Sequence, residues 1–181
     1  MALINNFVLV RFLGLCPFFT ESKKLSHSLS MGAAVTFVMV IASAVTWLLT
    51  NYILIPYNVE YMNIVTYLLV IASLVQAVEL FVKRTNYALY KSFGIYLPLI
   101  ATNCAVLGIV LINVKEAFPF LESVVAALGA GIGFTFVLAI MAGIRESLIL
   151  ADSPKAIKGL PVAFITAALL GLAFSAFAGV I

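Results

Sequence analysis

Long apolar runs, separated by short polar stretches, extend along this chain from one end to the other. A helix that spans a membrane needs about 20 mostly apolar residues. These runs are apolar on every face and do not alternate as strands of a β-barrel do, so we predict an all-α integral membrane protein. Six segments qualify as transmembrane helices: Ala2–Thr20, Ser28–Leu49, Tyr61–Val82, Tyr90–Ile112, Glu122–Gly143 and Leu160–Ile181.

Composition supports the same class. The chain is 65% hydrophobic and 9% charged, whereas soluble domains are roughly 45–50% apolar and about 25% charged. A soluble core of this size could not bury so much apolar surface. The basic residues are scattered without a basic stripe, which argues against nucleic-acid binding. The start of the chain lacks the basic region and cleavage site of a signal peptide. We therefore expect residues 1–181 to form a single membrane domain.

The distribution of basic residues predicts the orientation of the chain. Loops with an excess of lysine and arginine stay in the cytoplasm. Eight of the ten basic residues fall in the first, third and fifth loops, so these loops should be cytoplasmic and both termini should lie outside. The eight are Lys23, Lys24, Lys83, Arg84, Lys91, Arg145, Lys155 and Lys158.

The two halves of the chain, approximately 1–82 and 90–181, resemble each other. In the first half, the run 36–39 (Thr-Phe-Val-Met) lies 30 residues after Asn6. In the second half, the similar run 135–138 (Thr-Phe-Val-Leu) lies 32 residues after Asn103. Because each half holds three spans, the second half would enter the membrane from the opposite side. This predicts an inverted 3+3 repeat, a pattern that places binding sites near the bilayer midplane.

Helix-breaking residues concentrate in the first and fourth spans. The first holds Gly14 and Pro17, and the fourth holds Gly94, Pro98 and Asn103. Proline removes a backbone donor and clashes with the preceding turn. Two interpretations stay open: ordinary kinked helices, or two discontinuous helices whose freed backbone groups surround a site.

The chain has two cysteines, Cys16 and Cys104, one on each of these spans. A lone cysteine in an apolar span is usually a small hydrophobic residue. Counted from the nearest cytoplasmic lysine, however, the thiols lie about 10 and 20 Å deep, on either side of a bilayer centre that is about 15 Å down. An iron–sulfur cluster normally needs four cysteines, so a cluster here would have to be shared with a second chain.

Other polar and small residues have both structural and functional interpretations. Glu79 fits an ion pair with Lys83 at the membrane boundary, or a place in an ion path, since carboxylates within membranes are costly. Gly129 and Gly133 form a GxxxG pattern, which is typical of close helix packing. A second small-residue ridge runs along the last span: Ala167, Gly171, Ser175 and Gly179.

Two longer stretches carry a family resemblance. The run 5–18 (NNFVLVRFLGLCPF) and the run 94–108 (GIYLPLIATNCAVLG) resemble signatures of the RnfA/NqrE family of membrane proteins, as do the runs 142–146 and 164–167. The resemblance covers almost the whole chain. Pro17 favours the Rnf branch over the NqrE branch. Family members usually carry further residues before the paired asparagines Asn5 and Asn6.

The resemblance implies a subunit of a redox-driven ion pump, the Rnf-type ferredoxin:NAD⁺ oxidoreductase, in a bacterial or archaeal cytoplasmic (inner) membrane. It implies an inverted homologous six-helix partner (RnfE-like) beside RnfB-, RnfC-, RnfD- and RnfG-like subunits. Each of the pair would give two cysteines to a shared [2Fe–2S] cluster, here Cys16 and Cys104, whose electron relay would drive Na⁺ or H⁺ movement. The chain would not be catalytic alone. The alternatives are an NqrE-type subunit of a Na⁺-translocating NADH:quinone reductase, a small inverted-repeat secondary transporter, and a structural scaffold.

Overall fold

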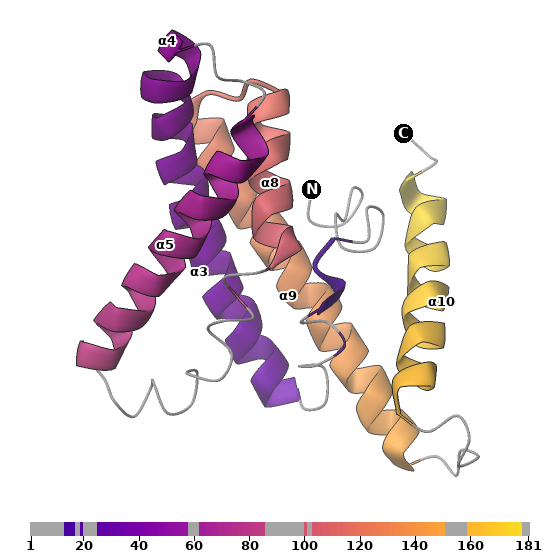
Figure 1. Ribbon diagram of the computed structural model, residues 1–181. Coiled ribbons are helices and arrows are strands. Elements are labelled where there is room, and N and C mark those ends of the chain that lie inside the picture. Colours follow the sequence, from indigo (N-terminus) through magenta and orange to yellow (C-terminus); the bar gives the residue numbers. More distant parts are fainter. Residues whose placement is uncertain are drawn as a thin grey trace. The chain divides into compact units, whose positions relative to one another are not determined.

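The computed structural model of the chain describes residues 13–16, 19, 25–57, 62–85, 100, 103–150 and 159–178. Every regular element in this part of the chain is a helix (Figure 1), which confirms the all-α fold class. In chain order the elements are α3 (Leu25–Leu49), the π-helix η1 (Thr50–Leu54), α4 (Ile55–Tyr57), α5 (Asn63–Thr85), α8 (Cys104–Lys115), α9 (Phe120–Leu150) and α10 (Leu160–Ala178).

The described helices overlap five of the predicted spans, and α8 covers only the second half of the fourth. Two stretches, Leu25–Leu54 and Phe120–Leu148, are long and apolar enough to cross a membrane, and the remaining apolar helices are shorter. Most of the first predicted span, Ala2–Thr20, lies outside the described residues, as does the beginning of the fourth, Tyr90–Ile112. The count of six spans and the two broken helices therefore stay predictions.

Two predicted loops are helical in part. Arg145, assigned to the fifth loop, lies within α9, because no proline follows Gly143 until Pro154 to end the helix. The second loop was expected from Thr50 onward, but helical backbone continues to Tyr57. The widened π-turn Thr50–Leu54 ends two residues before Pro56, whose ring would clash with the carbonyl four residues back in a regular α-helix.

The described helices form two compact units. The first unit comprises Met1–Thr36 with Gly129–Ile181, and the second comprises Phe37–Leu128. Helix α3 begins in the first unit and ends in the second, whereas α9 begins in the second and ends in the first. These units are defined by contacts, whereas the predicted repeats, approximately 1–82 and 90–181, are defined by sequence similarity. The repeats therefore stay a prediction.

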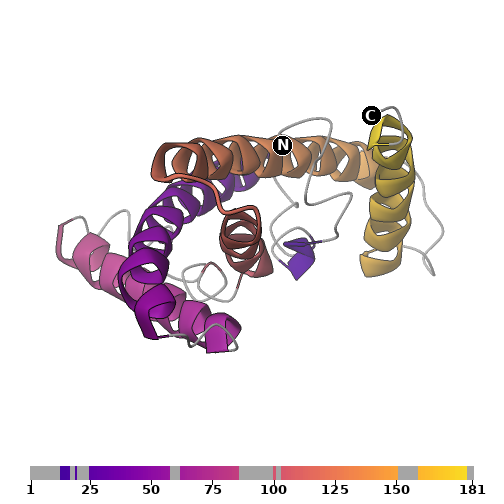
Figure 2. The same cartoon turned by 90° about the horizontal axis from the view of Figure 1, so that it is seen from above.

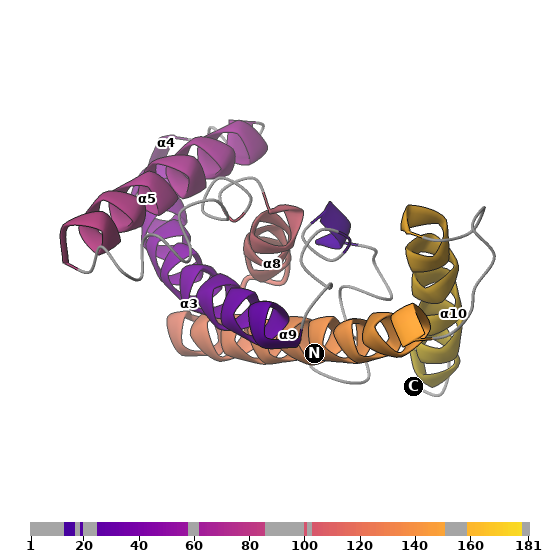
Figure 3. The same ribbon diagram turned by 90° about the horizontal axis from the view of Figure 1, so that it is seen from below.

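In the first unit, α3 and α9 cross closely through two glycine–threonine pairs. A Cβ atom added to Gly32 would lie 2.6 Å from the side chain of Thr135, and one added to Gly131 would lie 2.5 Å from the side chain of Thr36. The two threonine hydroxyls lie 3.5 Å apart, and each donates to the carbonyl of the glycine four residues earlier. Figure 3 shows this end of α3 lying against α9. The glycines allow the backbones to approach.

In the second unit, a short turn joins α8 to the first residues of α9 (Figure 2). Ala117 takes a positive φ of 51° in this turn. Helix α5 packs on α8, and its side chains Tyr67, Ile71 and Val75 are buried at steps of four along one face. The opposite face of α5 is apolar and exposed, as at Leu69. Such a surface is what a helix presents to lipid rather than to water.

Candidate functional site

Cys16 lies in the first unit, directly after a backbone turn. Gly14 is buried and has a φ of +86°, a conformation that a side chain would disfavour. Leu15 and Cys16 follow in helical conformation, and the Cys16 side chain is exposed. The glycine turn therefore presents a thiol at the surface of the unit.

Cys104 lies in the second unit as the first residue of α8, and it is half-buried. Asn103 is the N-cap of this helix, because its Oδ1 accepts a hydrogen bond of 3.0 Å from the backbone N–H of Ala105. The N-terminal end of a helix carries partial positive charge. Cys104 thus lies at the positive end of α8, where an anionic group would be stabilised.

The same Asn103 carries an unused hydrogen-bond donor. Its side chain is 2% exposed, and its Nδ2 has no hydrogen-bond partner among the described residues. A buried amide that lacks a partner loses its bonds to water without replacement, which costs about 1–3 kcal/mol. An acceptor near Cys104 would relieve that cost.

Arg145 of α9 holds the chain segment just after Cys16. Its Nη1 donates a 2.8 Å hydrogen bond to the carbonyl of Phe19, and the contact is partly buried. The Phe19 ring packs on Phe164 of α10, with centroids 4.3 Å apart. All four residues belong to the first unit. Arg145 and Phe164 therefore fix the backbone three residues beyond the thiol.

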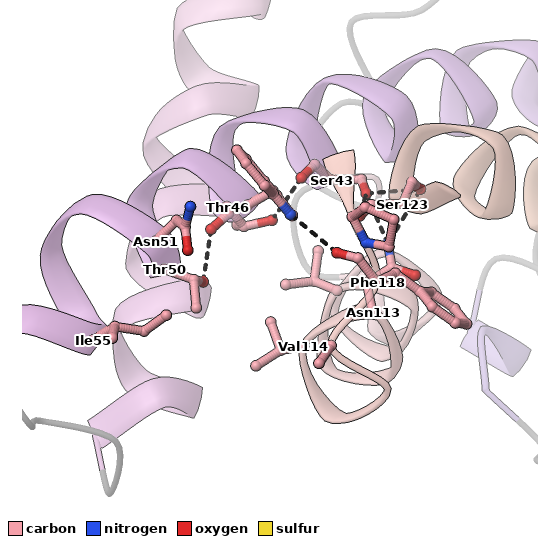
Figure 4. A pocket seen from close by; sticks show the side chains of 13 residues that line it. Ser43, Thr46, Thr50, Asn51, Ile55, Asn113, Val114, Phe118 and Ser123 are labelled. Carbon is pink, nitrogen blue, oxygen red and sulfur yellow. Dashed lines mark hydrogen bonds between the residues drawn. The ribbon is translucent and has the colours of Figure 1, made fainter. Parts of the chain in front are cut away.

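The second unit contains a buried polar cluster that the sequence did not reveal (Figure 4). Asn113 Nδ2 donates to Ser43 Oγ at 2.8 Å and to the Ser123 carbonyl at 3.3 Å. The hydroxyls of Ser43 and Ser123 lie 2.9 Å apart. Nearby, Trp47 Nε1 donates to the carbonyl of Phe118 at 3.0 Å, which ties α3 to the α8–α9 turn.

These polar groups border a cavity of about 280 Å³ within the second unit. Its wall combines hydroxyl and amide side chains with apolar ones, and none of the described residues that form it is charged. The lining residues are Ser43, Thr46, Trp47, Thr50, Asn51, Ile55, Val110, Asn113, Val114, Ala117, Phe118, Pro119 and Ser123.

The remaining predicted features are found in part. On α10, Ala167 and Gly171 of the predicted ridge are buried, Ser175 is exposed, and Gly179 lies outside the described residues. Glu79 is half-buried on α5, and the side chain of its predicted partner Lys83 also lies outside them. Within the described residues, no group of three or more His, Cys, Asp or Glu side chains could hold a metal ion.

The long apolar helices, with apolar side chains on their outer faces, define a helical membrane protein. Comparison with known proteins makes the assignment specific. The model of a family described as "Rnf-Nqr subunit, membrane protein" matches residues 1–181, so the chain belongs to the Rnf-Nqr family.

Three relatives illustrate the similarity. The A-type subunit of an ion-translocating oxidoreductase complex from Syntrophotalea carbinolica is 51% identical over 99% of this chain and 93% of the relative. A protein of the same description from an Azoarcus species is 52% identical over 98% of this chain and 92% of the relative. The corresponding component of the Na⁺-translocating ferredoxin:NAD⁺ oxidoreductase complex of Acetobacterium woodii is 47% identical over 97% of this chain and 92% of the relative.

Proposed function

We propose that this chain is the A-type subunit of an Rnf-type ion-translocating oxidoreductase, which couples electron transfer between ferredoxin and NAD⁺ to ion movement across a membrane. The observation that carries this proposal is the identity of about half of all residues, along nearly the full length, to proteins of that description. The Acetobacterium woodii relative is described as Na⁺-translocating, which favours Na⁺ over H⁺ for this chain. The other subunits of the complex would supply the ferredoxin and NAD⁺ chemistry.

The role of the chain in this complex would be to carry electrons through the membrane. Cys16 and Cys104 would be its ligands to a [2Fe–2S] cluster, and a homologous subunit would supply two further thiolates. A [2Fe–2S] cluster transfers single electrons and takes cysteine thiolates as ligands. Two thiolates from one chain leave the cluster incomplete, so its site would lie at the interface between the subunits.

The surroundings of Cys104 fit such a group. The thiol lies at the positive end of α8, which would face the negative charge of a thiolate-ligated cluster. Beside it, the buried Nδ2 of Asn103 lacks a partner among the described residues, and the sulfur atoms of a cluster accept hydrogen bonds from such donors. Cys16 is exposed on its own unit, which suits a ligand at a subunit interface.

An inverted repeat would place the two halves of the chain around a local two-fold axis. The reciprocal contacts at the α3–α9 crossing support this arrangement, because Gly32 meets Thr135 while Gly131 meets Thr36. The two glycines are 99 residues apart in the sequence, as are the two threonines, and reciprocal contacts of this kind arise where two equivalent surfaces meet. The proposed topology has six spans in the cytoplasmic membrane, with both termini outside.

Deletion of the gene for this chain tests the function. Everted membrane vesicles from the native host should reduce NAD⁺ with reduced ferredoxin and take up Na⁺ or H⁺ at the same time. Vesicles from the deletion strain should do neither, and a plasmid copy of the gene should restore both. Normal coupled activity in the deletion strain would refute the proposal.

Reporter fusions test the proposed topology separately. A reporter that follows Ile181 should report the outer compartment, and one that follows Lys24 should report the cytoplasm, because the Lys23–Lys24 pair should remain inside. The same compartment for both fusions would contradict the six-span arrangement.

A further inference from the structure

The cavity in the second unit presents hydrogen-bond acceptors to whatever occupies it. The Thr46 hydroxyl donates to backbone carbonyls within α3, and the Thr50 hydroxyl donates to the Thr46 carbonyl at 2.7 Å. The Trp47 N–H is bound to Phe118. Because these protons are engaged, the two threonine hydroxyls can only accept, and the Thr50 oxygen already accepts one bond of 2.8 Å from the Tyr67 hydroxyl. Thr46 is therefore the hydroxyl with the freer oxygen.

Asn113 adds an acceptor whose orientation is fixed. Its amide lies 3.3 Å from the carbonyl of Ser123, and a carbonyl can only accept, so the atom that faces it must be Nδ2. Its Oδ1 consequently faces elsewhere and has no partner among the described residues, although the side chain is only 6% exposed. An unpartnered buried carbonyl oxygen calls for a donor or a cation.

The composition of the wall selects the kind of cation. Hard cations bind oxygen ligands, and carboxylates supply the negative charge that divalent cations need. The thirteen lining residues include hydroxyls and amides but no carboxylate. A cavity of about 280 Å³ also holds several molecules of water, at about 30 Å³ each. These features favour a partly hydrated monovalent cation.

We propose that this cavity is a Na⁺-binding site, with Asn113 Oδ1 from α8 and the Thr46 hydroxyl oxygen from α3 as ligands. The proposal rests on the function proposed above and places the ion that the complex moves within this chain. The π-helix that begins at Thr50 borders the cavity, and π-helical turns in proteins are frequently associated with functional sites.

The test uses the chain's one tryptophan, Trp47, which lines the cavity. The purified full-length chain in lipid nanodiscs is titrated with NaCl at constant ionic strength, with choline chloride as the balancing salt, while the fluorescence of Trp47 is recorded. A saturable Na⁺-dependent change is expected. MgCl₂ should produce a weaker response, and a stronger response to Mg²⁺ than to Na⁺ would overturn the assignment to a monovalent cation.

Matched variants locate the response. Thr46→Val keeps the shape of the side chain and removes the oxygen, and it should weaken Na⁺ binding about tenfold, equivalent to about 1.4 kcal/mol. Thr66→Val is the control, because Thr66 also donates to the carbonyl four residues earlier but lies half-buried on α5, outside the cavity.

Three results would overturn the site. The first is no saturable fluorescence response to any cation, which means that water alone fills the cavity. The others are an unchanged Na⁺ response in Thr46→Val and a loss of Na⁺ affinity in Thr66→Val equal to that in Thr46→Val. Circular dichroism and gel filtration establish that each variant is folded. Electron transfer from ferredoxin to NAD⁺ in vesicles distinguishes the two proposals. If it depends on this chain while Trp47 reports no cation binding, the site is wrong and the proposed function stands.

Discussion

Alanine substitution at the α3–α9 crossing tests whether the two helices approach as closely as the structure indicates. A Cβ atom at position 32 would lie 2.6 Å from both Cγ2 and Oγ1 of Thr135 and 2.8 Å from its Cβ. Carbon atoms pack at about 3.5–4.0 Å, so the backbones must separate. Threonine is β-branched and stiff at χ1, so a change of rotamer offers little relief.

The magnitude follows from two opposing effects. Overpacking of this kind costs typically about 1–3 kcal/mol, whereas alanine is better than glycine within a helix by roughly 0.5–1 kcal/mol. The net loss for Gly32→Ala should be about 1–2 kcal/mol, which lowers the melting temperature of a chain of this size by about 2–8 °C. Gly131→Ala should behave alike, because its Cβ would meet Thr36 at 2.5 Å.

Gly143→Ala on α9 is the matched control. Nothing lies within 4 Å of a Cβ added there, so the variant should gain the helix propensity and melt about 1–4 °C higher. The assay is thermal unfolding of the full-length chain in nanodiscs, followed by circular dichroism. The double variant Gly32→Ala with Thr135→Gly removes all three close atoms and should recover part of the loss. Equal stabilisation by Gly32→Ala and Gly143→Ala would refute the close crossing.

Three further predictions concern the proposed cluster, measured by iron content and electron paramagnetic resonance of the chain co-expressed with its homologous partner. Cys16→Ser and Cys104→Ser should each abolish the signal while the pair still assembles, and a full signal in both variants contradicts the ligand assignment. Asn103→Asp keeps the helix-capping oxygen but removes the unused N–H. The reduction potential of the cluster should therefore fall without loss of protein stability. An unchanged potential argues against a hydrogen bond from Asn103 Nδ2 to the cluster. Arg145→Met should reduce iron occupancy, because it removes the Arg145 hydrogen bond to the Phe19 carbonyl. Arg145→Lys should retain more iron than Arg145→Met. Equal iron occupancy in the two variants would show that the bond does not position Cys16.

The sequence predicts helix positions well where apolar runs are long and bounded by polar residues. The run Ser28–Leu49 corresponds to α3, Leu25–Leu49. Hydropathy alone does not identify features that depend on helix geometry. It places the end of the second span at Leu49, since it cannot detect the π-turn that carries the helix on toward Pro56.

Contacts between helices are harder to predict, because the helices are apolar on all faces and hydropathy does not reveal their rotation. The GxxxG pattern directs attention to Gly129 and Gly133, whereas the close approach described at the crossing involves Gly131 and Gly32. The better signal is a pattern shared by both halves, a glycine four residues before Thr36 and Thr135.

The polar cavity escapes sequence analysis for a related reason. Ser43, Asn113 and Ser123 come from three separate segments, and each alone resembles an isolated polar residue near a span end. Asn113 follows the predicted end of the fourth span at Ile112, so the sequence places it in a loop. The two cysteines, by contrast, can be singled out because breaker residues surround both of them in the sequence.

Cys104 and the proposed cation site lie at opposite ends of one short helix of the second unit, which has an energetic consequence. Cys104 begins α8, and Asn113 lies in its last turn. Nine residues separate them, a distance of about 14 Å along the axis. An electron added to a cluster at Cys104 would attract a cation at Asn113 by about 1 kcal/mol at an effective dielectric constant of about 20. Coupling between two sites is reciprocal, so Na⁺ should ease reduction of the cluster as much as reduction tightens Na⁺ binding.

A redox titration of the co-expressed pair, with sodium chloride or choline chloride as the salt, measures this coupling. Saturating Na⁺ should raise the one-electron potential of the cluster by about 50 mV. Thr46→Val weakens the cation site without touching Cys104, so it should shift the midpoint of the Na⁺ dependence to higher concentration and leave the potential in choline unchanged. A potential that is insensitive to Na⁺, or a Na⁺ dependence that is identical in Thr46→Val, would show that the ends of α8 are not coupled in this way.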